Sequence, residues 1–286
     1  MRHVPGSSCF APLVAALAAL SVAGCGDKQP QERLAPPGPP PTPTLEQVKS
    51  AALTAQPGVV LWEPTFHTAD LDGIIGNEAI VMLSSTSGGS GEFVHIAVYG
   101  MRDGALTSLG TLPVGDRTRL QSLWVERGKV VMDVIEVGPQ DPACCGTQVA
   151  RKSFGFEGGT FKQLASEVRG MLALSMLSAN EWTLIEIDGQ PLPADVEPPL
   201  IHVESNRIRG FAGCNRFTAS VAESKPGEIE IGAAAAEKKA CPAPQMELEQ
   251  KFLAQLDAVN RYSYVAGQLA LTWADGERVG TLLLRK

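Results

Sequence analysis

The cysteines are the residues of this chain whose types and spacing could do chemistry. The chain contains six: Cys9, Cys25, Cys144, Cys145, Cys214 and Cys241. A cysteine thiolate acts as a nucleophile or a metal ligand, whereas paired cysteines in an oxidising compartment form structural disulfides. The stretch FAGCNRF, residues 211–217, is open to all three interpretations. The choice among them depends on the compartment, and therefore on the N-terminal segment.

Residues 1–24 have the form of a secretory signal. Arg2 and His3 precede an apolar stretch that is shorter than the roughly 20 residues of a membrane span. The stretch ends in SVAGC, which resembles the bacterial lipobox, where small residues precede an acylated cysteine. We therefore expect Cys25 to carry a diacylglycerol and acyl chains such as palmitate. An ordinary signal peptide followed by a chance cysteine is the alternative.

Residues 25–44 predict a tether between the lipid and a folded body. They are polar and rich in proline, so they cannot build a core and act as a semi-rigid spacer. Gly26 follows the acylated cysteine, which favours the outer membrane over the inner one. We expect a cell-envelope protein, anchored in the outer membrane and facing the periplasm. Its partners are then the membrane, through the lipid, and an envelope protein or the cell wall. The net charge of −7 argues against a nucleic-acid partner.

Residues 45–165 are expected to form a β-rich domain. A short helix over residues 45–55 is followed by seven strand-like runs with turn signals between them. The clearest run alternates Val94, Ile96 and Val98 on one face with His95 and Ala97 on the other. The short connections predict an antiparallel meander around one core. Residues 162–178 are interpreted as an amphipathic connector to a second domain.

Two features of the first domain could bind a metal ion. Cys144 and Cys145 are adjacent, and they could close on each other, bind a thiophilic metal or pair with other thiols. A vicinal disulfide is favoured, because no second Cys/His cluster with zinc spacing exists. Asp70 and Asp72 in ADLDG resemble the opening of a calcium loop, but Ile74 and Ile75 replace the next ligand and the turn glycine. A plain Asx turn is the favoured interpretation of that segment.

The C-terminal part carries a more specific pattern. Trp182, Leu184, Ile187 and Gly189 give W-x-L-x-x-I-x-G, and residues 207–217 follow as RIRGFAGCNRF. A second cysteine then precedes a helical pattern that ends near residue 259. Over residues 178–286 the chain resembles the META domain, the HslJ-like family. Its most diagnostic part is GCNRF: Gly213, Cys214, Asn215, Arg216 and Phe217. The family's T-x-M-A-C is replaced here by EKKAC, residues 237–241.

The resemblance implies an α+β fold in which an antiparallel sheet packs with one helix. The helix is expected near residues 246–259, with Leu248, Phe252, Leu256 and Val259 on one face. Members of the family are often envelope lipoproteins or secreted proteins with loose links to stress tolerance, antibiotic tolerance or motility. The resemblance establishes no catalytic residue, cofactor or metal.

Within this resemblance FAGCNRF is interpreted as a bend and not as a reaction centre. Gly210 and Gly213 permit close backbone approach or a positive φ, and Asn215 can bond the nearby main chain or adopt a left-handed conformation. A nucleophilic Cys214 would need a base, and His202 is the one histidine of this domain, without an identifiable orienting residue. We expect a Cys214–Cys241 disulfide. Two reduced core thiols and a catalytic cysteine are the alternatives.

Three functions follow from these patterns. The favoured one is a lipid-anchored, non-enzymatic envelope protein with a structural or interaction role in the envelope or in stress tolerance. The alternative is a metal or ligand sensor that uses Cys144 and Cys145. A hydrolase is the least favoured, because H-E-x-x-H, G-x-S-x-G and a convincing Cys/His pair are all missing from the sequence.

Overall fold

The computed structural model of the chain describes residues 40–86 and 91–286. The signal segment, Cys25 and most of the proline-rich tether therefore lie outside the described residues. In the described part no helix is both long enough and apolar enough to cross a membrane.

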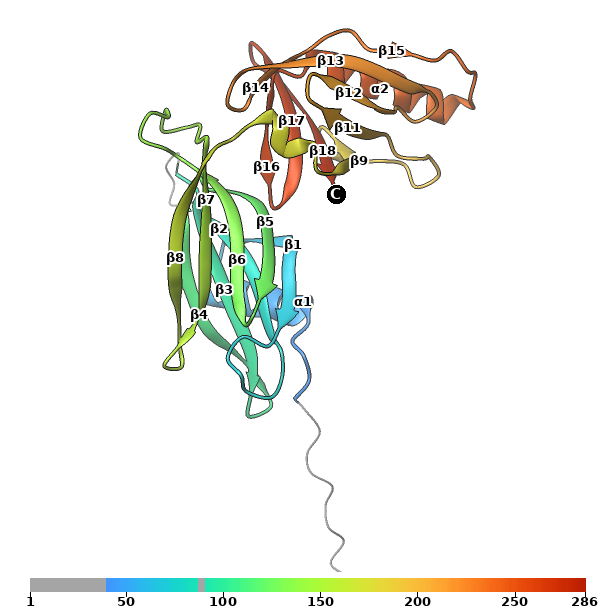
Figure 1. Cartoon of the computed structure of the whole chain (residues 1–286). Coiled ribbons are helices and arrows are strands. Elements are labelled where there is room, and N and C mark those ends of the chain that lie inside the picture. Colours follow the sequence, from blue (N-terminus) through green and yellow to red (C-terminus); the bar gives the residue numbers. More distant parts are fainter. Residues whose placement is uncertain (1–39, 87–90) are drawn as a thin grey trace, which may run out of the picture. The chain divides into compact units, whose positions relative to one another are not determined.

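The N-terminal β-rich part contains two separate antiparallel sheets, each a simple meander (Figure 1). The first sheet has the order β1-β2-β3-β4, with strands β1 (Val60–Ala69), β2 (Glu78–Ser85), β3 (Phe93–Arg102) and β4 (Ala105–Asp116). The second has the order β5-β6-β7-β8, with strands β5 (Arg119–Glu126), β6 (Lys129–Glu136), β7 (Gln148–Glu157) and β8 (Thr160–Met171).

The two sheets share one apolar core. The sequence predicted a single meander around one core, whereas the strands form two sheets, because β4 and β5 do not pair. Val94, Ile96 and Val98 of β3 are fully buried in this core. Phe154 and Phe161 from the second sheet belong to the same cluster. Their rings lie 6.2 Å apart. The strand alternation read from the sequence therefore identified the face that packs between the sheets.

The other face of the first sheet is covered by helix α1 (Leu45–Ala55). Thr44 caps this helix with a capping box that includes Gln47. Val48 and Ala52 are buried in a second apolar cluster that also contains Ala97 and Tyr99 of β3. Strand β3 is therefore buried on both faces.

Strand β8 replaces the amphipathic connector that we expected over residues 162–178. It pairs with β7 from Glu157↔Thr160 to Gln148↔Met171, and only Phe161 on it is buried. An edge strand with nearly all side chains exposed has no apolar alternation, which is why the sequence pattern did not reveal it. The true connector is short and holds a 3₁₀ turn, η1 (Leu174–Leu177).

The C-terminal part, residues 181–285, is a single antiparallel sheet that closes on itself, because β9 pairs with both β11 and β18. We call it the C-terminal barrel. Its ring strands are β9 (Glu181–Ile187), β11 (Leu200–Glu204), β12 (Arg207–Phe211), β13 (Arg216–Lys225), β14 (Glu228–Ile231), β16 (Arg261–Val265), β17 (Gln268–Asp275) and β18 (Arg278–Arg285). Two short strands pair with ring strands: β10 (Gln190–Pro191) with β9, and β15 (Ala235–Ala236) with β13.

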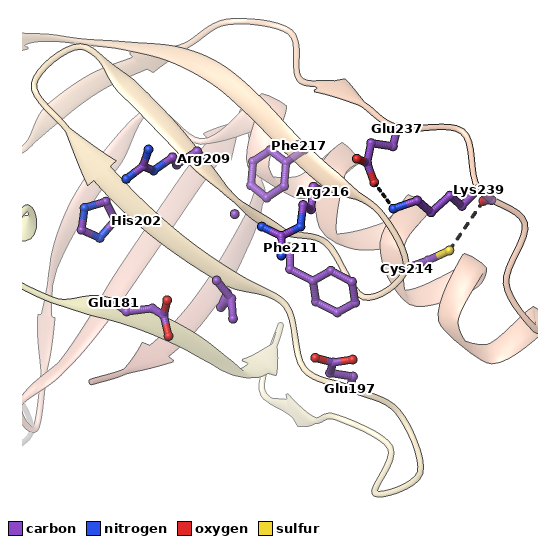
Figure 2. A pocket seen from close by; sticks show the side chains of 12 residues that line it. Glu181, Glu197, His202, Arg209, Phe211, Cys214, Arg216, Phe217, Glu237 and Lys239 are labelled. Carbon is purple, nitrogen blue, oxygen red and sulfur yellow. Dashed lines mark hydrogen bonds and ion pairs between the residues drawn. The ribbon is translucent and has the colours of Figure 1, made fainter.

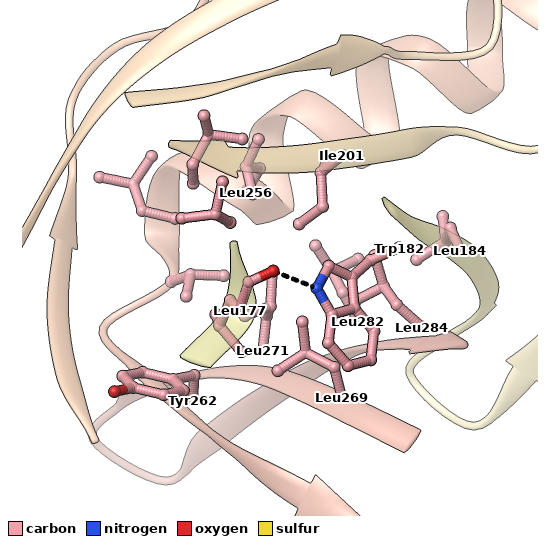
Figure 3. Close-up of a cluster of buried hydrophobic side chains, with 14 of the residues drawn as sticks. Leu177, Trp182, Leu184, Ile201, Leu256, Tyr262, Leu269, Leu271, Leu282 and Leu284 are labelled. Carbon is pink, nitrogen blue, oxygen red and sulfur yellow. Dashed lines mark hydrogen bonds between the residues drawn. The ribbon is translucent and has the colours of Figure 1, made fainter. Parts of the chain in front are cut away.

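The barrel core is built around Trp182, which is fully buried (Figure 3). Its indole nitrogen donates a hydrogen bond to the carbonyl of Leu177, at 3.0 Å. Helix α2 (Ala243–Ala258) packs against the same cluster. The apolar face predicted for this helix is confirmed, because Leu248, Phe252, Leu256 and Val259 are all buried. The expected α+β fold of antiparallel sheets with a C-terminal helix is therefore confirmed.

Candidate functional site

The cysteine of FAGCNRF is part of a disulfide. Cys214 lies in the turn between β12 and β13, and it is bonded to Cys241 just before helix α2, with a Cα–Cα distance of 6.0 Å. The staple therefore joins the β12–β13 turn to the entry of the helix. A bonded sulfur carries no thiolate, so it can act neither as a nucleophile nor as a metal ligand in this state.

Asn215 holds the same region together by hydrogen bonds. Its side-chain amide donates to Glu249 Oε1 at 2.9 Å and to the carbonyl of Lys239 at 3.2 Å, and its Oδ1 accepts from the Lys239 backbone at 2.8 Å. Its own backbone N–H donates to Glu249 Oε2 at 2.6 Å. Asn215 and Glu249 are both buried, so these bonds satisfy polar groups that water cannot reach.

Glu249 is a site residue that was not predicted from the sequence, although a signal was present. Glu249 lies within the apolar pattern of α2, directly after Leu248, and a carboxylate on the buried side of a helix needs a polar partner. The sequence expectation for Asn215 itself was half right. Its side chain bonds the main chain, but the left-handed conformation belongs to Gly213, at a φ of +110°.

The remaining motif residues point to opposite sides of the sheet. Phe217 is buried and packs edge-on against Phe252 of α2, with ring centroids 5.7 Å apart. Arg216 is exposed and lines a cleft on the outside of the barrel. Gly210 allows close approach, because a Cβ there would lie 1.9 Å from the carbonyl oxygen of Leu200.

The cleft has a volume of about 640 Å³ and lies over strands β9, β11, β12 and β13 (Figure 2). Strand register produces its floor as two rows of outward side chains. One row places His202 between Glu181 and Arg209. The other places Phe211 between Leu200 and Arg216, and residues 237–239 supply part of the rim.

The charges of the cleft are mixed, and one cation stands apart. Lys239 pairs with Glu237 at 2.6 Å, and this hydrogen bond holds the pKa of Glu237 below its usual value. Arg209 forms an ion pair with Glu204. Among the described residues, Arg216 has no ion-pair partner within 4.0 Å. The cleft therefore presents, beside the partly buried ring of Phe211, a guanidinium that no described carboxylate contacts within 4.0 Å, although its charge also helps to lower the pKa of Glu237.

Cys214 and His202 both line this cleft, which the sequence did not reveal. They lie at opposite ends of it, with Phe211 and Arg216 between them (Figure 2). The imidazole Nε2 of His202 is 3.3 Å from Glu204 Oε1. Because the sulfur is bonded and the ring is remote from it, the two residues do not form a nucleophile–base pair.

Cys144 and Cys145 are bonded to each other in the loop between β6 and β7. Asp141 organises this loop by accepting hydrogen bonds from the backbone of Gly138 at 2.8 Å and from the backbone and hydroxyl of Thr147 at 2.6 and 2.7 Å. Burial raises the pKa of Asp141, but these hydrogen bonds outweigh burial and hold the pKa below its ordinary value. The favoured interpretation of the pair as a vicinal disulfide agrees with the structure.

Asp70 and Asp72 come close to a third carboxylate, Glu78, which the sequence did not single out. Both aspartates form the expected Asx turn, accepting from the backbone N–H of Gly73 and Ile74 at 2.8 and 2.9 Å. Arg102 forms ion pairs with Asp72 and with the fully buried Glu78. A guanidinium therefore already supplies positive charge to this cluster.

The C-terminal part is thus a small antiparallel barrel with a disulfide-bonded turn, and the family comparison covers the same part of the chain. Residues 175–285 match the family model described as META domain, so the chain contains a META domain over nearly the range expected from the sequence.

Two solved structures are similar to part of this chain. An NMR structure of a protein from Burkholderia xenovorans is 23% identical, with a TM-score of 0.33, covering 39% of this chain and 84% of that one. A second NMR structure is 24% identical, with a TM-score of 0.32, covering 40% and 95%. Neither description names an activity, and no curated protein matches the chain. These comparisons give no indication of catalysis.

Proposed function

We propose that the chain is a lipid-anchored, non-enzymatic binding protein of the cell envelope, whose META domain contacts a carboxylate-bearing envelope partner through the cleft on the barrel. The presence of a META domain in residues 175–285 suggests an envelope or stress-related role. The lipobox-like SVAGC and the proline-rich tether support anchoring through Cys25.

One observation carries this proposal. The motif at residues 213–217 contains no free thiol that could react, and its Arg216 lines the cleft. Cys214 is bonded to Cys241 and Asn215 is fully hydrogen-bonded, while the next residue, Arg216, lines the cleft without an ion-pair partner within 4.0 Å among the described residues. A guanidinium pairs well with carboxylates, and a partly exposed phenyl ring beside it adds apolar contact. Carboxylates abound in cell-wall peptides and on acidic envelope proteins.

The cleft can be tested by crosslinking in living cells. A photo-reactive residue at position 211 should give one discrete adduct, or association with the cell wall, and Arg216→Ala in the same chain should abolish it. The same probe at Val279, an exposed residue on β18 outside the cleft, is the control and should give none. Equal crosslinking with and without Arg216 would contradict a cleft-based function.

The anchor is tested separately by fractionation. The chain with Cys25 should sediment with membranes, and Cys25→Ser should release it into the soluble fraction. Membrane association that does not depend on Cys25 would contradict the proposed anchor.

Ligand sensing by Cys144 and Cys145 is a second candidate function. It is favoured by the location of the vicinal disulfide, which lines a hollow of about 780 Å³. In the bonded state Cys144 and Cys145 offer no thiolate to a metal ion. An organic ligand in the hollow is therefore favoured over a metal ion as the species that is sensed.

A further inference from the structure

A hollow beside the vicinal disulfide is larger than the cleft on the barrel and separate from it, since the two share no lining residue. It lies where several connections meet. These are the β4–β5 turn, the β6–β7 loop, the end of β8, the β13–β14 turn and the start of β16. Its volume, about 780 Å³, falls within the usual range of small-molecule sites.

Part of the lining of the hollow is apolar. The disulfide of Cys144 and Cys145 contributes two polarisable sulfur atoms, and Met171, which is 45% exposed, contributes a third. Pro142 and Pro226 add rigid apolar rings. These apolar groups can pack against the C–H face of a ring-shaped ligand.

The lining also holds more basic than acidic side chains, in a chain whose net charge is −7. The lining contains four basic side chains, Arg117, Arg119, Lys225 and Arg261, and two acidic ones, Asp141 and Glu228. Arg117 and Arg119 also form ion pairs with carboxylates outside the lining, Asp116 at 2.6 Å and Glu92 at 2.9 Å. Asp141 is already engaged by the backbone at Gly138 and Thr147. Glu228 is shared by Lys225 and Arg261, each at 3.5 Å, a long distance for a charge-assisted hydrogen bond.

Arg117 provides an independent sign of an incomplete site. Its Nε is buried and has no hydrogen-bond partner among the described residues, while its NH2 group pairs with Asp116 at 2.6 Å. Its φ is +50°, an unusual backbone conformation for a residue other than glycine. Unpaired polar groups and strained backbone often gather at ligand sites.

We propose that this hollow binds an anionic sugar, with the basic side chains holding its phosphate or carboxylate and the vicinal disulfide supporting the ring. The proposal rests on the second candidate function and names its ligand class. The mixed lining supports this class. Ser263 and Thr272 supply hydroxyls for a sugar, and the cations supply the anion contacts.

Calorimetry on the full mature chain, at low salt, tests the ligand class directly. The probes are glucose 6-phosphate, glucuronate, glucose and inorganic phosphate. We expect at least one of the two anionic sugars to bind at least tenfold more tightly than either glucose or inorganic phosphate. Comparing the two shows whether phosphate or carboxylate is preferred. The proposal would be overturned if glucose 6-phosphate and glucuronate both bound no more tightly than glucose. Binding of inorganic phosphate alone would also overturn it, because it would show an adventitious ion only.

Variants locate the binding. Arg261→Gln and Arg117→Gln should each weaken binding of the preferred sugar about tenfold, because each removes a charge-assisted contact. The Arg261 side chain is 55% exposed, so we expect Arg261→Gln to fold normally. This variant can therefore test the site even if Arg117→Gln fails to fold. Arg278→Gln, a 75% exposed arginine outside the hollow, is the matched control and should bind as the wild type does. Unchanged affinity in Arg261→Gln would overturn the proposed site without affecting the anchor or the META cleft.

Discussion

At the scale of single residues, Asn215 connects three parts of the C-terminal barrel. It bonds the segment that carries Cys241, through Lys239, and helix α2, through Glu249. Glu249 is buried and accepts only from Asn215 among the described residues, so the two side chains depend on each other. Removing one leaves the other's polar atoms unsatisfied.

Asn215→Ala should lower the free energy of unfolding by about 2–4 kcal/mol, because a buried carboxylate loses a donor and the Lys239 backbone loses both partners. Urea unfolding measures the change. Asn206→Ala is the control, since Asn206 is exposed, and its stability should stay within about 0.5 kcal/mol of the wild type. Equal losses in the two variants would contradict this role of Asn215.

The three tyrosines of the chain give a pH test at the same scale. Burial raises the pKa of Tyr99, Tyr262 and Tyr264, and the hydrogen bond and negative charge of Glu223 raise that of Tyr262 further. A raised folded-state pKa contributes stability that is complete below the unfolded value of about 10 and is lost as pH rises through the folded value.

Ultraviolet absorbance should therefore show almost no phenolate in the folded chain at pH 10, whereas the chain in concentrated urea is about half ionised there. The free energy of unfolding should fall above pH 10, and it should fall less steeply in Tyr262→Phe. Normal titration of all three tyrosines in the folded state would contradict the burial described here.

At the scale of elements, close contact between β11 and β12 shapes the cleft. The pairing Ile201↔Gly210 brings the backbone of Leu200 within 1.9 Å of the place where a Cβ at position 210 would lie. The outward row of Leu200, Phe211 and Arg216 depends on this register.

Gly210→Ala should therefore destabilise the chain by about 3 kcal/mol or more, because a backbone atom cannot move aside as a flexible side chain does. Gly91→Ala is the control, since a Cβ there would meet only side-chain atoms at 3.4 Å, and it should cost less than about 1 kcal/mol. Thermal melting followed by circular dichroism compares the two. A stable Gly210→Ala chain would show that the register of β11 and β12 differs from the one described.

Sequence patterns predicted the elements whose side chains alternate or repeat clearly. Strand β3, helix α2 and the turn at Ser205 were all visible as apolar periodicity or turn chemistry. Strand β8 was not, because its exposed side chains carry no pattern. Closure of the C-terminal barrel was also invisible, since β9 pairs with β18 across almost the whole domain.

The same limit applies to the sites. The motif at residues 213–217 marked the stapled turn, but it did not reveal which side chains of other strands join it. His202 and Arg209 reach the cleft only through strand register. The hollow near Cys144 draws its cations from connections far apart in the sequence, so no local pattern could identify it.

At the scale of the whole molecule, the two disulfides have different expected effects. The Cys214–Cys241 bond spans 27 residues and restricts the unfolded chain, whereas Cys144–Cys145 spans one and restricts almost nothing. Replacing Cys214 and Cys241 by serine should cost about 3–4 kcal/mol by loop entropy. Replacing Cys144 and Cys145 by serine should cost much less. Urea unfolding of the two double variants measures both, and the reverse order would contradict a purely structural staple at Cys214.

The central claim is that this chain is exported and anchored through a lipid, and that its remaining cysteines form disulfides and do not act as reactive thiols. Mass spectrometry of the protein extracted from membranes without reducing agent, after alkylation of free thiols, tests it in one measurement. The account predicts an N-terminal peptide that begins at an acylated Cys25, a peptide pair linking Cys214 to Cys241, and no alkylation of Cys144 or Cys145. An unprocessed N-terminus, or alkylated thiols at Cys214 and Cys241, would contradict it.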